Sequence, residues 1–184
     1  NITLLAADGS TIKDFRYNDT LPWPTSPDGT GFTLVLIAPD ENPDHQLASS
    51  WRPSTASGGN PTTSDAISFT GDPNADLDFD GMTALLEYTL GTDDNAPNLP
   101  NEIYELTGPP NNLTFAIQRN LGADDTIVTL QTSPDLQTWI SADALLELSN
   151  EENLGNGKAR YTWSLQASAD PGTQLFVRIR VELR

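Results

Sequence analysis

The residues best suited to chemistry lie in one short segment, where three aspartates alternate along the chain ahead of a glycine and a glutamate. Asp76, Asp78 and Asp80 are followed directly by Gly81, and Glu87 closes the pattern. This D-x-D-x-D-G-x₅-E spacing is typical of a calcium-binding loop, because alternate carboxylates turn inward, the glycine permits a sharp bend and the glutamate supplies two oxygens. The sequence therefore predicts a bound Ca²⁺.

Other positions in this segment complete the predicted coordination. Met82 follows the glycine and is expected to offer its main-chain carbonyl, whereas Ala84 has no side-chain oxygen, so water is expected in its place. Asp72 and Asn74 are candidates for outer oxygens, although their spacing does not require it. The alternative interpretation is an acidic turn that caps an ordinary helix, but the repulsion among its carboxylates would then have no cation to offset it.

A short helix is predicted directly after the bend. Apolar residues recur at i, i+3, i+4 and i+8 from Met82 to Leu90, which is one face of a helix, and Gly91 is suited to end it. Glu87 lies on this helix, so metal binding would fix the helix to the loop. The preceding residues 71–75 are turn-like, which predicts a single structural site rather than a paired calcium sensor.

Composition narrows the class of protein. The formal net charge is −17, from 26 acidic and 9 basic residues, and this disfavours binding to nucleic-acid backbones or anionic membranes. The absence of cysteine excludes disulfides and thiol chemistry. No apolar run approaches the roughly 20 residues of a membrane-spanning helix. A single loop of this kind is useful where calcium is plentiful, which favours an extracellular or cell-surface location.

The sequence offers little equipment for catalysis. His45 is the only histidine and lies in a polar stretch, where a solvated loop side chain is the expected role. The two lysines, Lys13 and Lys158, have no glycine-rich phosphate loop beside them. Carboxylate-pair chemistry stays open by counting alone. Trp139 and Trp163 suit either a glycan-stacking platform or a core role, and their strand-forming contexts favour the core.

The rest of the chain is expected to be mostly strand, with two segments rich in Ser, Thr, Gly, Pro and Asn as linkers. Residues 67–69 in the first linker are candidates for docking onto a neighbouring part of the protein. An Asp8-Gly9 pair signals a hairpin turn near the start. The predicted strands are 2–5, 12–17, 32–37, 113–118, 126–131, 144–148, 160–165 and 174–183. The last of these alternates apolar and charged residues, which indicates one buried and one exposed side.

Several motifs in the first quarter of the chain resemble a known family. They are Leu5–Gly9, Pro22-Trp23-Pro24, Asp28–Gly31, Thr33-Leu34 and Trp51-Arg52. Together they resemble the C-terminal half of a bacterial lamin-tail domain, which implies an immunoglobulin-like β-sandwich. The opening strands of that family are absent, so the resemblance also implies an apolar face and strand edges that need a partner.

A second resemblance covers residues 72–184. The calcium loop and helix of 72–91, the segment Thr132–Trp139 and the strand Phe176–Val181 look like the C-terminal region of large secreted proteins from environmental bacteria. In those proteins an EF-hand or dockerin-like calcium loop precedes a terminal β-sandwich. The resemblance implies an extracellular stalk or surface module and assigns no substrate.

These observations predict a mainly β protein in which two Ig-like β-sandwich units are joined by a short calcium-loop and helix module. In this scheme the ion would fix the angle between the two units. The predicted divisions are 1–52 for a partial lamin-tail-like domain, 53–71 for a linker, 72–92 for the calcium module, 93–101 for a second linker and 102–184 for the C-terminal sandwich.

The function expected is that of a non-catalytic, calcium-stabilised structural or adhesive module of a larger secreted or surface protein. Other domains of the parent protein, or neighbouring copies that add a β-strand and build a fibre, are the expected partners. The alternative is a carbohydrate-binding accessory module of a secreted enzyme, with glycans as the partner. A catalytic domain based on a carboxylate pair is the least favoured interpretation.

Overall fold

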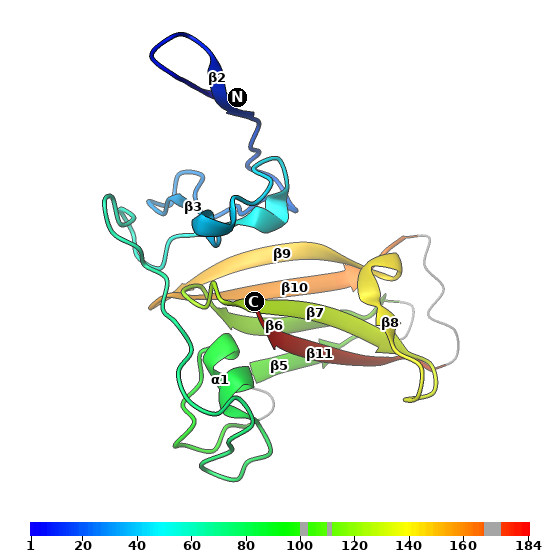
Figure 1. Cartoon of the computed structure of the whole chain (residues 1–184). Helices are drawn as coiled ribbons and strands as arrows, with labels where there is room; N and C mark the ends of the chain where they lie inside the picture. Colours follow the sequence, from blue (N-terminus) through cyan, green and yellow to red (C-terminus); the bar gives the residue numbers. More distant parts are fainter. Residues whose placement is uncertain (100–102, 110–111, 168–173) are drawn as a thin grey trace.

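Two antiparallel sheets in the C-terminal half form the main body of the protein in this computed structural model, which describes residues 1–99, 103–109, 112–167 and 174–184. The protein is mainly β, as predicted (Figure 1). The first sheet has the order β5 (Tyr104–Thr107), β6 (Thr114–Asn120), β10 (Lys158–Leu165), β9 (Leu146–Gly155). The second has the order β11 (Phe176–Leu183), β7 (Thr126–Ser133), β8 (Ile140–Ser141).

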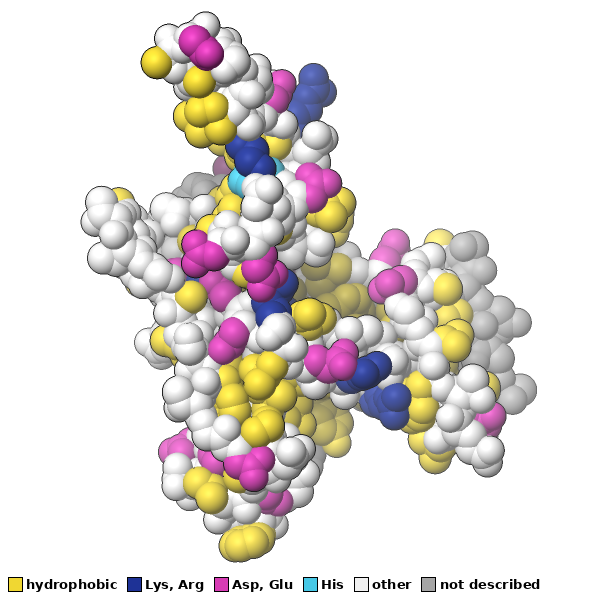
Figure 2. Space-filling model, viewed as in Figure 1, with side chains coloured by type: hydrophobic (Ala, Val, Ile, Leu, Met, Phe, Trp, Pro, Cys, Tyr) yellow, Lys and Arg dark blue, Asp and Glu magenta, His cyan; other side chains and the backbone are white. Residues whose placement is uncertain are grey.

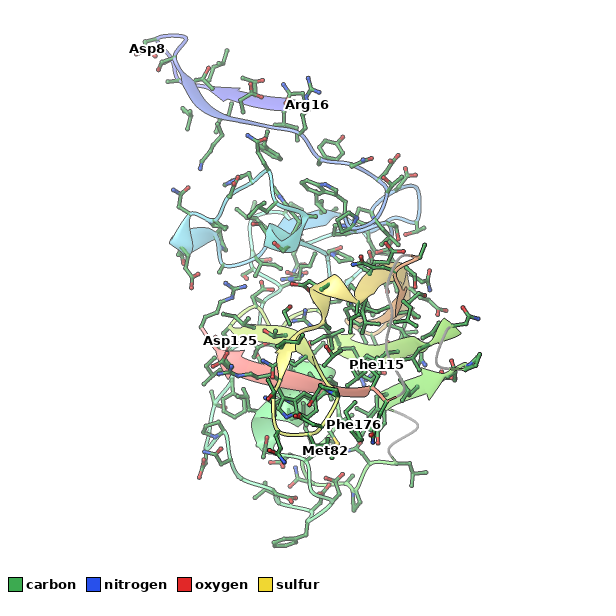
Figure 3. The ribbon with its side chains drawn as sticks, turned by 90° about the vertical axis from the view of Figure 1, so that its right-hand side faces the viewer. Asp8, Arg16, Met82, Phe115, Asp125 and Phe176 are labelled. Atoms are coloured by element: carbon green, nitrogen blue, oxygen red, sulfur yellow. The ribbon has the colours of Figure 1, made fainter. Side chains whose placement is uncertain are left out.

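The two sheets pack their apolar faces together in a sandwich-like arrangement. Alternate residues of each strand turn inward, so Phe115 of β6 lies opposite Trp163 of β10, and Leu130 of β7 lies opposite Ile179 of β11. Phe115 and Leu130 belong to one buried hydrophobic cluster, in which Ile117 is fully buried, and Trp163 and Ile179 pack against it. Phe115, labelled in Figure 3, belongs to this core.

The predicted helix is present as α1 (Ala84–Leu90) and covers this core. Leu90 is 1% exposed, and Met82 and Leu86 pack against the same cluster. Gly91 ends the helix in the left-handed conformation, at φ 75°, where its N–H donates to the carbonyl of Glu87. The helix therefore belongs to the C-terminal sandwich, whereas the sequence predicted a joint between two separate sandwiches.

Most of the predicted C-terminal strands are confirmed. Four strands lie within about two residues of their predicted ranges, namely β6, β7, β10 and β11. The predicted strand 144–148 instead begins with a 3₁₀ turn at Ala142–Ala144 and continues into the longer β9, while β5 and β8 were not predicted. Polar residues fill the far end of β9, which is formed by pairing with β10 rather than by its own propensity. The predicted boundary at 101/102 lies outside the described residues.

The N-terminal region forms two separate two-stranded sheets instead of a half-sandwich. β1 (Ile2–Leu5) and β2 (Thr11–Phe15) form the predicted hairpin, with Gly9 at φ 84° in the turn. β3 (Leu34–Leu36) pairs with β4 (Trp51–Pro53), and the 3₁₀ turns Pro39–Glu41 and Ala48–Ser50 lie between them. The hairpin projects away from the rest of the molecule, as Figure 1 shows.

Residues 53–71 are held against the sandwich by specific hydrogen bonds, although their composition predicted a linker. The N–H of Ile67 donates to the carbonyl of Gly122 at 2.8 Å, and that of Phe69 donates to Asp125 Oδ2 at 2.7 Å. The hydroxyl of Tyr88 on α1 lies 2.7 Å from Asp125 Oδ1. This segment thus joins the turn after β6 to the helix. No helix within the described residues has the length and apolar character to cross a membrane.

A buried ion-pair network attaches the β3–β4 sheet to the sandwich. Arg52 is 5% exposed, and its guanidinium lies 2.7 Å from Asp65 Oδ1 and 2.5 Å from Asp124 Oδ1. Glu151 of β9 provides a second attachment, because its two oxygens accept hydrogen bonds from the Thr25 N–H at 2.7 Å and the Ser26 hydroxyl at 2.8 Å. The N-terminal region is therefore anchored independently of the acidic segment 76–87.

Candidate metal centre

The structure brings the three predicted aspartates together in one tight loop ahead of α1. One carboxylate oxygen from each of Asp76, Asp78 and Asp80 lies within 4.8 Å of the other two. The bend that allows this uses positive φ at Gly81, 93°, and at Phe79, 63°. Among the described residues, this is the cluster of acidic or metal-ligating side chains with the geometry to hold a metal ion.

Backbone hydrogen bonds fix the orientation of each aspartate. The N–H of Gly81 donates to Asp76 Oδ2 at 3.1 Å, that of Asp80 to Asp78 Oδ1 at 3.0 Å, and that of Met82 to Asp80 Oδ1 at 2.8 Å. The second oxygens of two of these carboxylates, Asp76 Oδ1 and Asp78 Oδ2, are buried and have no hydrogen-bond partner. The loop thus holds acceptors that nothing in the described chain satisfies.

Glu87 presents a third such oxygen from the helix. The side chain is fully buried, and its Oε1 accepts hydrogen bonds from Asn98 Nδ2 at 2.6 Å and from the Thr92 hydroxyl at 3.2 Å. Its Oε2 is buried without a partner. Burial, followed by the neighbouring carboxyl of Asp94 and the charge of Asp78, raises the pKa of Glu87 to about 7. A glutamate held in this way needs either a proton or a cation.

Asn98 is a site residue that the sequence analysis missed. Its N–H donates to Asp80 Oδ2 at 2.8 Å, while its side-chain amide donates to Glu87 Oε1. It therefore bridges the aspartate loop and the helix from the segment that composition assigned to a linker. The sequence signal for this contact was the polar run after Gly91. In the same run, Asp94 also contacts the loop, because its Oδ1 accepts from the Leu77 N–H at 3.4 Å.

The outer residues and the bend have contacts of their own, and the predicted role of the Met82 carbonyl stays a prediction. Asp72 and Asn74 form a turn of their own, in which the Asn74 N–H donates to Asp72 Oδ1 at 2.9 Å. The Ala84 N–H donates to the carbonyl of Ala75 at 2.7 Å, which closes the loop before the helix begins. The side chain of Met82 packs against the hydrophobic core, so this residue links the loop to the sandwich interior (Figure 3).

The donor set fits a hard divalent cation. All four side chains, from Asp76, Asp78, Asp80 and Glu87, offer oxygen, and Ca²⁺ takes 6–8 oxygen ligands whereas softer metals favour nitrogen or sulfur. Glu87 lies outside the group of three aspartates, at the position where the loop pattern places the bidentate ligand. The buried, unpartnered oxygens belong to the first, third and twelfth positions of that pattern.

The other residues weighed for function have packing roles. His45 was expected to be solvated, but its ring packs against Phe15 and Trp51 at centroid distances of 5.2 and 5.7 Å. Its Nδ1 lies 2.8 Å from the carbonyl of Pro43. The cause is the return of the chain to the hairpin, which a local polar pattern does not reveal.

The two C-terminal tryptophans also make packing contacts. Trp163 packs against Phe115 in the core, with ring centroids 6.5 Å apart. The guanidinium of Arg178 lies over the ring of Trp139, 4.1 Å from its centroid. These contacts favour packing roles for both tryptophans over a glycan-stacking platform.

Comparisons with family models, curated proteins and solved structures find no match to this chain. The resemblances to a lamin-tail domain and to the C-terminal region of large secreted bacterial proteins therefore rest on the motifs themselves and stay predictions. The case for a metal centre depends on the geometry of the loop and helix alone.

Proposed function

We propose that this protein is a calcium-stabilised structural or adhesive module of a larger extracellular protein. One observation carries the proposal: Asp76 Oδ1, Asp78 Oδ2 and Glu87 Oε2 are all buried and unpartnered, and all three belong to positions that a calcium loop uses as ligands. Unpaired buried carboxylate oxygens are costly, because each loses its hydration without a replacement.

The cation would supply the positive charge that this group of carboxylates lacks. Asp76, Asp78, Asp80 and Glu87 would hold it, and the backbone N–H groups and Asn98 already orient their side chains. The absence of cysteine from the chain, and the packing of its one histidine in the N-terminal aromatic cluster, favour a hard cation over zinc or copper.

Calcium binding would act on the sandwich through α1. Glu87 and Leu90 lie on the same short helix, so a bond between Glu87 and the ion also holds Leu90 in the hydrophobic core. The predicted role of the ion, fixing an angle between two sandwiches, is therefore replaced by the fastening of one sandwich to its own covering helix. A module of this kind suits a calcium-rich exterior, where the site would stay filled.

Isothermal titration with CaCl₂ tests the site directly. We expect one Ca²⁺ per chain in the wild type and a loss of at least about 10-fold in affinity in Asp78→Asn, because a ligand charge is removed. Glu147→Gln is the matched control, since it removes one exposed negative charge from β9 of the same sandwich. No heat of binding at millimolar calcium, or equal losses in both variants, would reject the proposal.

The projecting hairpin supports a second candidate role, strand addition between copies. Ile2, Leu4 and Ile12 are 46–54% exposed, and Figure 2 shows hydrophobic side chains gathered on this lobe. Its described contacts with the rest of the chain are few, notably Lys13 Nζ to Asn42 Oδ1 at 2.6 Å and the packing of Phe15. A two-stranded sheet with free edges and apolar side chains is marginal alone and suited to pairing.

Sedimentation equilibrium over a wide concentration range tests this role. Copies that add strands to one another should associate as concentration rises, and Leu4→Lys should shift them toward monomer by adding charge to the hairpin. Leu154→Lys is the matched control, because Leu154 is similarly exposed but lies on β9. A monomer at all concentrations, with intact-mass spectra of the natural material showing a longer polypeptide, would favour completion by the parent protein instead.

A further inference from the structure

A cavity of about 710 Å³ lies at one end of the sandwich interior, distant in sequence from the calcium loop. Its floor is formed by β6, β7, β9 and β10, and residues of the N-terminal region, including Pro24 and Trp51, cover it. Clefts and cavities that bind small molecules are typically about 300–1,000 Å³ and mix apolar walls with a few polar groups. The cavity has the size of such a site.

Arg119 enters this cavity as a cation without a counter-ion. It follows Ile117 on the inward face of β6, opposite Ala159 of β10. Its Nε is buried without a hydrogen-bond partner, and no carboxylate of the described residues lies within ion-pairing distance of its guanidinium. Arg119 is half-buried, and in a chain with a net charge of −17 an arginine without an ion pair is unexpected.

Two of the three carboxylates that line the cavity are engaged by other residues. Both oxygens of Asp124 accept from Arg52, at 2.5 and 2.9 Å, and both oxygens of Glu151 accept from the N-terminal region at Thr25 and Ser26. The third carboxylate of the lining, Asp143, is exposed and makes no described ion pair. Asp124 is thus neutralised by Arg52 and Glu151 is held by neutral donors, while the guanidinium of Arg119 has no ion-pair partner among the described residues.

Tyr161 adds a neutral polar group beside the arginine. It lines the same cavity on β10, and burial, opposed by the charge of Arg119, raises its pKa to about 12, so its hydroxyl keeps its proton at neutral pH. The remaining walls include Val128, Leu148 and Trp163. A guanidinium and a phenol set against an apolar wall match a ligand with one anionic end and a hydrocarbon body.

We propose that this cavity binds a small apolar monocarboxylate, with its carboxylate paired to Arg119 and its hydrocarbon part against Val128, Leu148 and Trp163. The planar fork of an arginine fits a carboxylate with two parallel hydrogen bonds, and the ligand would give the guanidinium the counter-ion that the described residues do not provide. This site is independent of the calcium loop, so either proposal can fail without the other.

Titration with 4-phenylbutyrate and with its neutral amide, 4-phenylbutyramide, tests the proposal. Trp51 and Trp163 line the cavity, so tryptophan fluorescence reports binding, and calorimetry gives the affinity. We expect the carboxylate to bind the wild type at least about 10-fold more tightly than the amide, because a charge-assisted pair replaces a neutral contact. The measurements are made both in saturating calcium and in chelator.

Two variants test whether Arg119 supplies the positive charge that selects the carboxylate. Arg119→Gln should abolish the preference for the carboxylate, while Arg178→Gln, which removes an exposed arginine over Trp139, should leave it unchanged. The proposal is overturned if neither probe binds at millimolar concentration or if the two bind the wild type equally, comparisons that need no variant. It is also overturned if the preference survives Arg119→Gln, or if inorganic phosphate displaces the carboxylate at equal concentration.

Discussion

Replacing Glu87 with glutamine separates the two effects that its buried carboxylate has on stability. With calcium present, the carboxylate is expected to bind the ion through the oxygen that now has no partner. With calcium removed, the same carboxylate is a buried charge beside Asp78 and Asp94, and its pKa is raised to about 7. Glu87→Gln keeps the shape of the side chain and removes the charge. The substitution should therefore lower the stability of the protein with calcium present and raise it with calcium removed.

The size of the calcium effect follows from linkage. Calcium at 100 times its dissociation constant adds about 2.7 kcal/mol to the free energy of unfolding, which corresponds to about 5–10 °C in Tm for a chain of this size. A variant whose affinity is weakened about 100-fold would keep less than about 1 kcal/mol of that increment under the same conditions.

The size of the opposite effect follows from the pKa. Because the pKa of Glu87 rises from 4.5 to about 7, burying its charge without an ion costs on the order of 3 kcal/mol above pH 7. Glutamine does not have this cost, and its amide can donate to the carboxylate of Asp94. In chelator at pH 8, Glu87→Gln should therefore be more stable than the wild type.

Thermal melts followed by circular dichroism, each with 1 mM CaCl₂ and with EGTA at pH 8, give the four values needed. Glu147→Gln, which removes an exposed charge from β9, should keep the full calcium increment. Two results would refute this reasoning: a wild-type Tm that does not respond to calcium, or an increment in Glu87→Gln as large as that of the wild type. A Glu87→Gln variant less stable than the wild type in EGTA would refute the assigned cost of the buried charge.

Three further outcomes are expected. In EGTA, the wild-type free energy of unfolding should fall as pH rises from about 4.5 to 7, because folded Glu87 binds its proton more tightly than the unfolded chain does, and urea titrations of Glu87→Gln should lack this slope. Asn98→Ala should weaken calcium affinity about 10-fold by calorimetry, because Asn98 orients two of the proposed ligands, Asp80 and Glu87, by hydrogen bonds. Arg52→Met should lower the free energy of unfolding, measured in urea, by about 3 kcal/mol, because it leaves two buried aspartates unpaired. Removing the exposed ion pair between Arg160 and Glu105 should lower it by less than about 1 kcal/mol.

Local patterns were sufficient to predict the loop, the helix and most C-terminal strands. The positions of Asp76, Gly81 and Glu87 are fixed by a spacing contained in twelve consecutive residues. Strands such as β7 and β11 have the period-two alternation that one buried face requires. Each of these features is decided within a few residues, so each is visible in the sequence.

The missed features all depend on contacts between distant segments. Asn98 reaches Asp80 only because the chain reverses after Gly91, and no spacing rule marks it. Asp65 lies in a stretch whose composition is that of a linker, yet it pairs with Arg52 and holds that stretch against the sandwich. Composition indicates how a segment would behave alone. The position of the segment that contains Asp65 depends instead on its ion pair with the buried guanidinium of Arg52.

Two separate sets of contacts stabilise the protein, whereas the sequence predicted one calcium-dependent joint. The loop and α1 contact the core through Leu90 and Met82, whereas Arg52 and Glu151 attach the N-terminal region by bonds that involve no proposed calcium ligand. Effects of distant, unconnected sites on the free energy of unfolding add. Calcium removal and Arg52→Met should therefore destabilise the protein by the sum of their separate effects, while a joint that relied on both would show a coupling well above about 0.5 kcal/mol.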